Sequence, residues 1–139
     1  MAIEPYLFFN GRCEEALRFY QQAFGARIET VMRFRESPSP PSEGMLPQGW
    51  GDRIMHASFL IGDARVMASD GNSDAPPAFH GFRLSVVIEP EEEARRVFAA
   101  LADGGRVDMP FGPTFFAPYF GMVTDPFGVG WMVTAPPGA

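Results

Sequence analysis

The sequence predicts an α+β fold built from two βαβββ modules within a single domain, residues 1–139. The main observation is an internal repeat, in which Glu14–Glu29 is similar to Glu93–Asp108 at a constant spacing of 79 residues. Both copies are typical of an amphipathic helix that runs into a strand. In addition, Val66–Ser69 is similar to Trp131–Thr134 at a spacing of 65 residues. Because repeats constrain architecture more strongly than local propensity does, we expect two modules of the same design.

The difference between the two spacings locates an insertion in the first module. The spacing falls from 79 to 65 residues along the chain, so the first copy holds about 14 extra residues. The stretch Glu36–Gly49 has this size and is rich in Pro, Ser and Gly, which is typical of surface loops. We therefore expect module one at about residues 1–75, with a loop insertion at residues 36–52, and module two at about residues 76–139.

Each module is expected to contain one helix with a single buried face. Gly25 should end the first helix and Gly104 the second, because the left-handed backbone at many helix ends suits glycine. Pro90 suits the first turn of the second helix, since it lacks the amide that would be unpaired there. The buried faces should be formed by Ala16, Leu17, Tyr20, Ala23 and Phe24 in the first helix and by Ala94, Val97, Phe98 and Leu101 in the second.

Eight strands should accompany the helices, four in each module. Gly62 and Asp63 form a two-residue hairpin signal, and Asp125–Gly128 has proline and glycine where a four-residue turn favours them. The expected strands are Ile3–Phe9, Arg27–Phe34, Arg53–Ile61, Arg65–Ser69, Phe82–Ile88, Arg106–Met109, Tyr119–Thr124 and Val129–Thr134.

Composition and charge argue against several kinds of partner. The formal net charge of -6 would repel a phosphate backbone, and the longest basic run is the pair Arg95 and Arg96 on the second helix, so we expect no nucleic-acid partner. No apolar stretch approaches the roughly 20 residues that a membrane-spanning helix needs. The only cysteine, Cys13, has no partner for an internal disulfide, and no secretory signal is recognisable. These features favour a cytoplasmic protein without a membrane partner.

The chain resembles the vicinal oxygen chelate superfamily, which includes glyoxalase I, extradiol dioxygenases and the bleomycin and fosfomycin resistance proteins. Within it the resemblance is to the PhnB-like branch, and it extends nearly end to end. It implies a glyoxalase-like fold, with two βαβββ modules related by pseudo-twofold symmetry and each curling a mixed sheet around a cleft. The resemblance also implies a homodimer. The stretches that carry it are Tyr6–Gly11 with Glu15–Tyr20, His56–Gly62, Met67–Asp70, and Gly121–Met132.

The resemblance also locates the positions at which catalytic members hold a divalent metal, and these residues are poorly suited to it. Relatives bind the metal through His, Glu or Gln on the opening and closing strands of each module, and the corresponding residues here are Pro5, Met67, Leu84 and Met132. Proline and leucine offer no donor atom, and thioether sulfur suits soft ions only. We therefore expect no metal or other cofactor at the usual positions.

A displaced site is the alternative, at His56 and Asp70. Both residues are of ligand type and lie on strands that the Gly62-Asp63 turn would pair, with His56 opposite Ser69. Catalytic zinc normally has three protein ligands, so two candidates fall short of a complete site. His56 could also serve as a general base, or could be a half-buried strand histidine bonded to a neighbour, as buried polar groups usually are.

The remaining candidate ligand-binding residues are aromatic or hydroxylic. Small-molecule sites are mostly apolar with a few polar groups, and Phe115, Phe116, Tyr119 and Trp131 could supply the apolar surface. For each of them, packing in the core or in a dimer interface is the competing interpretation. Ser69 and Thr134 lie two residues beyond Met67 and Met132, so they share the same side of their strands and could contact a polar ligand.

Two functions are consistent with these features. The leading hypothesis is a protein that binds a small, partly apolar metabolite or xenobiotic in a cleft without the usual metal. The alternative is an enzyme, either a metal-dependent lyase, isomerase or dioxygenase with a displaced site near His56 and Asp70, or a metal-free catalyst that uses His56 as its base. A methyltransferase is not expected, because no glycine-rich turn suited to an adenosine cofactor follows the first strand.

Overall fold

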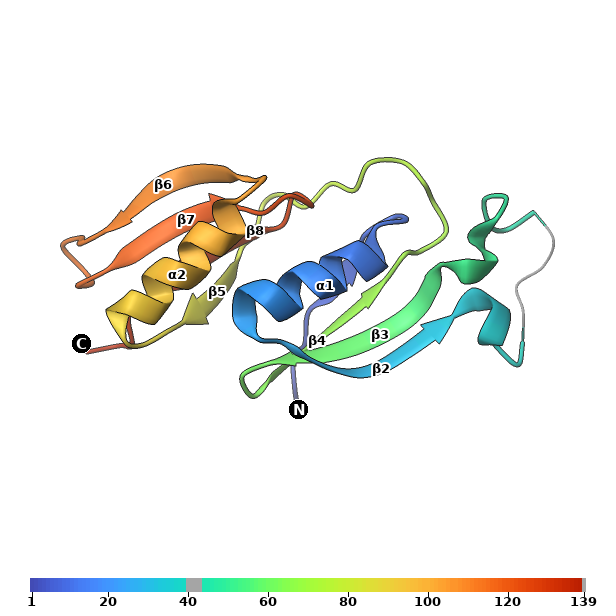
Figure 1. Cartoon of the computed structure of the whole chain (residues 1–139), viewed down its shortest axis with the longest axis horizontal. Coiled ribbons are helices and arrows are strands. Elements are labelled where there is room, and N and C mark those ends of the chain that lie inside the picture. The colour runs from blue at the N-terminus through green and yellow to red at the C-terminus, as the bar shows by residue number, and fades with distance from the viewer. Residues whose placement is uncertain (40–43, 139) are drawn as a thin grey trace. The chain divides into compact units, whose positions relative to one another are not determined.

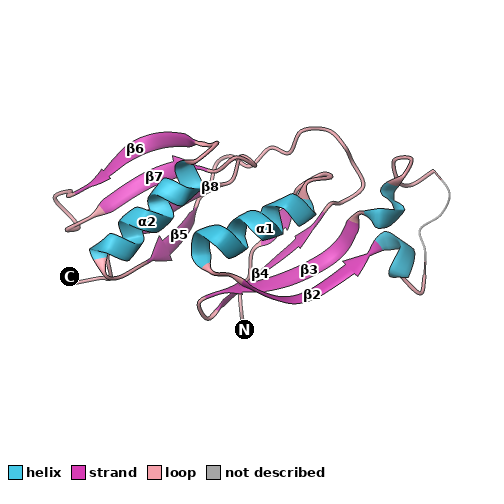
Figure 2. Cartoon of the chain, viewed as in Figure 1, coloured by secondary structure: helices cyan, strands magenta, loops and turns pink. Residues whose placement is uncertain are grey.

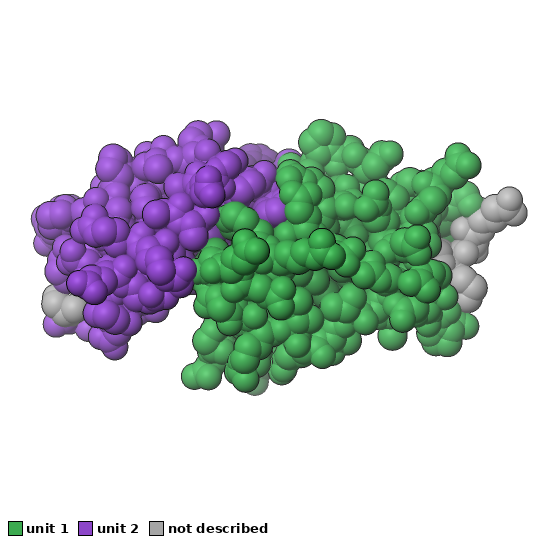
Figure 3. Space-filling view, in the orientation of Figure 1, with its two compact units in different colours: residues 1–77 green, residues 78–139 purple. Residues whose placement is uncertain are grey.

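The computed structural model describes residues 1–39 and 44–138, which form two compact units, Met1–Pro77 and Ala78–Ala139. Each unit contains one α-helix and one four-stranded mixed sheet (Figures 1 and 2), and Figure 3 colours the two units separately. The boundary lies two residues beyond the one expected from the repeat. The predicted α+β fold of two βαβββ modules is confirmed.

In the first unit the chain forms β1 (Tyr6–Phe8), α1 (Cys13–Phe24), β2 (Arg27–Arg33), β3 (Ile54–Ile61) and β4 (Ala64–Ser69). The strand order is β1-β4-β3-β2, with β1 parallel to β4 and the other pairs antiparallel. The predicted hairpin at Gly62-Asp63 is confirmed, because Ile61 pairs with Ala64. The opening strand begins three residues later than predicted.

The second unit repeats this arrangement with β5 (Leu84–Val87), α2 (Glu91–Ala102), β6 (Arg106–Gly112), β7 (Phe120–Thr124) and β8 (Gly130–Thr134). Its strand order, β5-β8-β7-β6, matches the first sheet strand for strand. The turn at Asp125–Gly128 forms as predicted, since the Gly128 amide donates to the Asp125 carbonyl at 3.0 Å. Strand β6 runs three residues further than expected.

The predicted insertion lies between β2 and β3. It contains two short 3₁₀ helices, Phe34–Glu36 and Trp50–Asp52, which lie near its two ends. Residues 40–43 of the expected loop lie outside the described residues. Trp50 is buried, and its indole N–H donates to the Gly71 carbonyl at 2.7 Å, so this end of the insertion is packed against its own module.

Helix α1 packs one face on its sheet through four of the five residues that its apolar spacing predicts, and the fifth, Phe24, is only partly buried. Ala16, Leu17, Tyr20 and Ala23 are buried, and the Tyr20 ring stacks on Phe59 of β3 with the ring centroids 5.8 Å apart. Gly25 ends the helix with a φ of 69°, and its amide donates to the Gln21 carbonyl. The predicted glycine end is thus confirmed.

Helix α2 is built in the same way. Ala94, Val97, Phe98 and Leu101 are buried as predicted, and Phe98 lies so close to β7 that a Cβ on Gly121 would be 2.7 Å from its ring. The helix begins at Glu91, one residue after Pro90, and ends at Ala102. Gly104 adopts a positive φ of 78° just beyond the end, close to the predicted position.

Each helix covers one face of its own sheet and leaves the other face uncovered by any helix of that unit. We call the latter the open face. On β4, Val66 and Ala68 are buried while Met67 between them is partly exposed, and on β8 Trp131 and Val133 alternate with Met132 in the same way. Because strand side chains alternate between the two faces, Met67 and Met132 lie on the open faces.

Among residues 1–39 and 44–138, no helix has the length and apolar character needed to span a bilayer.

Candidate functional site

A tyrosine and a histidine meet on the open face of the first module. Tyr6 comes from β1 and His56 from β3, on either side of β4, and the Tyr6 hydroxyl lies 2.9 Å from His56 Nδ1. Both side chains are partly exposed. Burial raises the pKa of Tyr6, so the phenol is protonated at neutral pH and can donate to the imidazole. The pair can therefore exchange hydrogen bonds, or a proton, with a molecule bound on this face.

A pocket of about 530 Å³ adjoins this pair. Aromatic, methionine and leucine side chains make up six of its ten described lining residues, and the polar contributions come from two asparagines, one serine and the Tyr6 hydroxyl. Phe8 continues the aromatic surface of Tyr6, with the ring centroids 5.0 Å apart. The pocket is lined by Tyr6, Phe8, Asn10, Phe34, Met45, Leu46, Met55, Ser69, Gly71 and Asn72.

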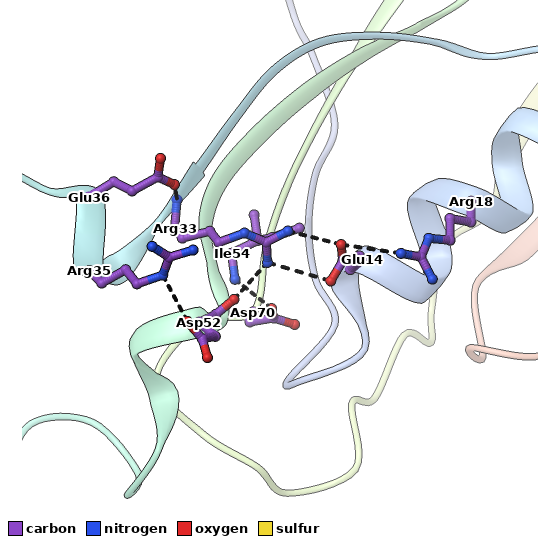
Figure 4. Close-up of polar contacts among 8 residues, drawn as sticks. All are labelled: Glu14, Arg18, Arg33, Arg35, Glu36, Asp52, Ile54 and Asp70. Atoms are coloured by element: carbon purple, nitrogen blue, oxygen red, sulfur yellow. Dashed lines mark hydrogen bonds and ion pairs between the residues drawn. The ribbon is translucent and has the colours of Figure 1, made fainter.

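The inserted loop contributes part of this lining, and ionic contacts fix its two ends (Figure 4). The Arg33 guanidinium donates to the Glu14 carboxylate at 2.9 Å and to the Asp52 carbonyl at 2.7 Å. The backbone N–H of Arg33 donates to the Glu36 carboxylate, and Arg35 pairs with Asp52 at 2.8 Å. These contacts join the entrance and exit of the insertion to each other and to helix α1.

Asp70 does not take part in the candidate site. Its Oδ1 accepts hydrogen bonds from the amides of Gly11 and Cys13, and its Oδ2 accepts one from the Ile54 amide, each at 2.8 Å. The carboxylate is buried and holds the start of α1 against the start of β3, as its position beside Ile54 in Figure 4 indicates. The structure therefore does not assemble a site from His56 and Asp70, because this carboxylate is engaged by three backbone amides.

Ser69 lines the pocket but is largely occupied by its own turn. The residue is 3% exposed, and its hydroxyl accepts a hydrogen bond from the Gly71 amide at 2.9 Å and donates one to the Ile54 carbonyl at 3.4 Å. The expected position of His56 opposite Ser69 agrees with the strand register, in which Ala57 pairs with Ala68. Thr134, the matching hydroxyl of module two, is partly exposed on the open face of β8.

The register corrects two of the positions expected for a metal ligand. Tyr6, rather than Pro5, lies beside Met67, and Ser85, rather than Leu84, lies beside Met132. Leu84 pairs instead with the buried Trp131, so it shares the helix-covered face. The positions that the resemblance implied on the two opening strands are thus one residue too early, and a shift of one residue moves a side chain to the opposite face of the sheet.

The corrected set of four residues still does not fit a hard divalent ion. A phenol, a hydroxyl and two thioethers replace the imidazoles and carboxylates that zinc, manganese or iron prefer. Within residues 1–39 and 44–138, no cluster of three or more His, Cys, Asp or Glu side chains is placed to hold a metal ion.

The aromatic candidates of module two divide into buried and exposed residues. Trp131 is 1% exposed and donates from its indole nitrogen to Asp125 at 2.9 Å, and Tyr119 donates its hydroxyl to the Ile88 carbonyl at 2.6 Å. Both belong to the core of their unit. Phe115 and Phe116 are exposed. They lie on a turn in which the Thr114 hydroxyl accepts a hydrogen bond from the Ala117 amide at 3.0 Å.

Several lining residues were not predicted from the sequence: Tyr6, Phe8, Met55 and the loop residues Met45 and Leu46. Alternation between apolar and polar residues, which normally distinguishes the two faces of a strand, is absent from β1 because Tyr6, Leu7 and Phe8 are all apolar. The 79-residue repeat relates Tyr6 to Ser85, and this polar counterpart was the available signal for the open face.

Comparison with known proteins agrees with this architecture. The family model of the Glyoxalase/Bleomycin resistance protein/Dioxygenase superfamily matches residues 2–133. Protein YjdN of Escherichia coli strain K12 is 35% identical over 138 residues, which cover 96% of this chain and 94% of YjdN.

Solved structures give the same result. PA1353 from Pseudomonas aeruginosa is 43% identical, with a TM-score of 0.84 and coverage of 99% of this chain and 98% of that protein. The PhnB protein from Bacillus cereus is 29% identical, with a TM-score of 0.80 and coverage of 98% and 100%. The fosfomycin resistance protein FosX from Listeria monocytogenes, 14% identical with a TM-score of 0.62 and coverage of 98% and 93%, shares the fold. This chain belongs to the Glyoxalase/Bleomycin resistance protein/Dioxygenase superfamily, with PhnB-like proteins among its relatives.

Proposed function

We propose that this protein binds a small, partly apolar metabolite or xenobiotic on the open face of module one, without the metal that catalytic members of the superfamily use. The observation that carries the proposal is the pocket of about 530 Å³ beside the Tyr6–His56 pair. Its volume falls within the range of small-molecule sites, roughly 300–1,000 Å³. Its lining has the composition of such sites, with apolar side chains and a few polar groups.

The apolar side chains suit ligands of varied shape. Phe8 and Phe34 offer rigid aromatic surface, whereas Met45 and Met55 are flexible and polarisable, so they adapt to different outlines. The Tyr6–His56 pair offers a hydrogen-bond donor or acceptor at one side of the pocket. A molecule with an aromatic or branched apolar body and one or two polar groups matches this arrangement.

The proposal is tested with protein labelled at its methionine methyl groups. Titration with a panel of neutral aromatic compounds should shift the NMR signals of Met45 and Met55, which line the pocket, and leave Met122 in module two unchanged. Replacing Phe8 by Ala should weaken the binding of the best compound by about tenfold, since it removes a large apolar contact. The matched control is Phe115→Ala, at a fully exposed phenylalanine of module two.

Two results would count against it. If no compound shifts Met45 or Met55, the pocket is not a binding site for this class of molecule. If Phe8→Ala and Phe115→Ala bind equally well, the compound binds elsewhere. The proposal that the protein binds its ligand without a metal is tested separately, by elemental analysis of freshly purified protein. One firmly bound equivalent of zinc, nickel, manganese or iron would refute it.

A second candidate function rests on the Tyr6–His56 pair itself. An imidazole and a phenol are both groups that can act in general acid–base catalysis, and such catalysis needs no metal. In this case a substrate bound in the adjacent pocket would be converted, and His56→Ala would abolish turnover while leaving binding measurable. Unchanged turnover in His56→Ala would remove this candidate.

The superfamily also supports two broader proposals. We propose a homodimer, because modules of two chains commonly pair in this superfamily, and sedimentation at several protein concentrations tests it. We also propose a cytoplasmic location, supported by a single cysteine that is buried and unpaired. Fractionation of cells that express the protein from its own promoter tests the location.

A further inference from the structure

The open face of module two carries a second pocket, and its chemistry is different. Its volume is about 530 Å³, and it contains two arginines, a histidine and a threonine next to aromatic side chains. Arg106 and Thr124 pair across β6 and β7, and Arg83 comes from the residue before β5. The lining consists of Phe79, His80, Gly81, Phe82, Arg83, Arg106, Thr124, Gly128, Gly130 and Met132.

A single carboxylate organises the two arginines. The Asp108 carboxylate accepts a hydrogen bond from the guanidinium of Arg83 at 2.9 Å and another from that of Arg106 at 2.7 Å. It accepts a third from the Thr124 hydroxyl. The Thr124 hydrogen bond and the two arginines lower the pKa of Asp108 to about 2, so it is ionised at neutral pH. Two guanidinium groups and one carboxylate leave a local charge of about +1, on a protein whose formal net charge is -6.

The first module balances its charges at the corresponding place. The 79-residue repeat relates Arg83 to Glu4, Arg106 to Arg27 and Asp108 to Glu29. There the cation between the two carboxylates is Arg65, which contacts Glu29 at 2.8 Å and Glu4 at 3.5 Å. The two acidic residues, Glu4 and Glu29, and the two basic residues, Arg27 and Arg65, give this group a net charge of zero. The excess positive charge is therefore specific to module two.

Gly130 is what makes room for this arrangement. It is the counterpart of Arg65 at the 65-residue spacing, and its missing side chain lets Arg83 lie across β8. A Cβ at Gly130 would lie 3.1 Å from Cγ and 3.4 Å from Cζ of Arg83. The Arg83 guanidinium is held there by the carbonyls of Val123 and Trp131, each at 3.3 Å, so it is oriented before any ligand arrives.

We propose that this second pocket is an anion site, which binds the carboxylate or phosphate-like group of a small molecule with an apolar body. Planar guanidinium groups suit the geometry of such oxyanions, and charge-assisted hydrogen bonds are the stronger kind. Phe79, Phe82 and Met132 offer apolar surface for the rest of the molecule. Among the described residues, the lining of the pocket in module one contains no charged residue, so the two pockets differ in chemistry.

Benzoate and benzyl alcohol are suitable probes, because they share a ring and differ in charge. With the full chain, benzoate should shift the NMR signals of Thr124, Gly130 and the Met132 methyl group, and benzyl alcohol should bind these residues at least tenfold more weakly. Arg106→Gln should weaken the binding of benzoate about tenfold, because it removes the guanidinium that is more exposed than that of Arg83. The matched control is Arg95→Gln, an exposed arginine of helix α2 on the covered side of the same sheet.

Gly130→Ala supplies a second test that keeps every charge. The added methyl group should displace Arg83 and weaken benzoate severalfold, while the far-ultraviolet circular dichroism stays that of the wild type. The proposal is overturned if benzoate shifts none of the three reporter residues, if benzyl alcohol binds as well as benzoate, or if Arg106→Gln binds like Arg95→Gln. If Arg106→Gln proves unstable, Arg106→Lys, which keeps the charge but loses the planar fork, should still weaken benzoate.

Discussion

The Tyr6 hydroxyl and His56 Nδ1 are hydrogen-bonded at 2.9 Å although 50 residues and strand β4 separate them. The contact exists because β1 is parallel to β4 and pairs Tyr6 with Met67, which places the phenol on the same face as His56. It joins the first strand of the module to the third. The pair therefore reports directly on whether the open face of module one is formed.

The coupling between these two side chains can be measured by a double-mutant cycle. Tyr6→Phe, His56→Ala and the double variant should give a coupling free energy of about 0.5–1 kcal/mol in urea unfolding, because the bond is partly exposed to water. Additive effects would show that the bond contributes nothing in solution.

Asp70 should behave as a structural residue. Replacing it by Asn puts an NH2 group, which cannot accept, in place of one of the two oxygens to which the backbone N–H groups donate, and removes the negative charge, so we expect a loss of about 3 kcal/mol in the free energy of unfolding. Asp74→Asn, at an exposed aspartate nearby, is the control and should change little. Wild-type stability of Asp70→Asn would reopen a role for this carboxylate in binding.

The Cys13 thiol should be unreactive in the folded protein. Its side chain is fully buried, and this burial, together with the negative charge of Asp70, raises its pKa, so the reactive thiolate is not formed at neutral pH. Labelling by a maleimide at pH 7.5 should be slower by roughly 100-fold or more than in urea, since it needs local opening. Equal rates in both conditions would contradict the buried position.

The Asp108 cluster should make the protein less stable in strong acid. Because the pKa of Asp108 is lowered to about 2, this carboxylate stabilises the folded state above about pH 4, and the effect disappears as the pH falls through 2. The stability advantage of the wild type over Asp108→Asn should therefore shrink by on the order of 1 kcal/mol between pH 6 and pH 2, after allowance for solvent screening. Urea unfolding at both pH values measures this difference.

Thr124→Ala provides a direct control for the cause of this shift. The Thr124 hydroxyl is the largest contributor, so its removal should raise the pKa of Asp108 measured by carboxyl NMR titration. An unchanged midpoint would assign the effect to the two arginines instead.

Most elements could be predicted because the signals that define them are local. The buried faces of both helices, the glycine that ends α1 and the Gly62-Asp63 hairpin follow from spacing and from backbone preferences of single residues. The repeat added the topology, since two similar segments imply two similar modules. Helix and strand ends differed by up to three residues, as at β1 and β6.

The candidate site was predicted only in part, because it depends on which face each strand side chain occupies. A shift of one residue along β1 exchanges Pro5 for Tyr6, and the same shift along β5 exchanges Leu84 for Ser85. Apolar residues fill both faces of β1, so no periodicity marks the correct register. The pairing of His56 with Asp70 finds no support in the structure for a related reason, since backbone amides distant in sequence engage the carboxylate.

By itself, the sequence determined the two-module α+β fold, the helices with their buried faces, the insertion and the acidic net charge, because each is encoded in neighbouring residues or in their repetition. Only the tertiary structure decided that Tyr6 meets His56, that Asp70 ties α1 to β3, and that Gly130 leaves room for Arg83. These relationships join side chains and backbone groups that the strand register brings together, and register is set by the packing of the whole module.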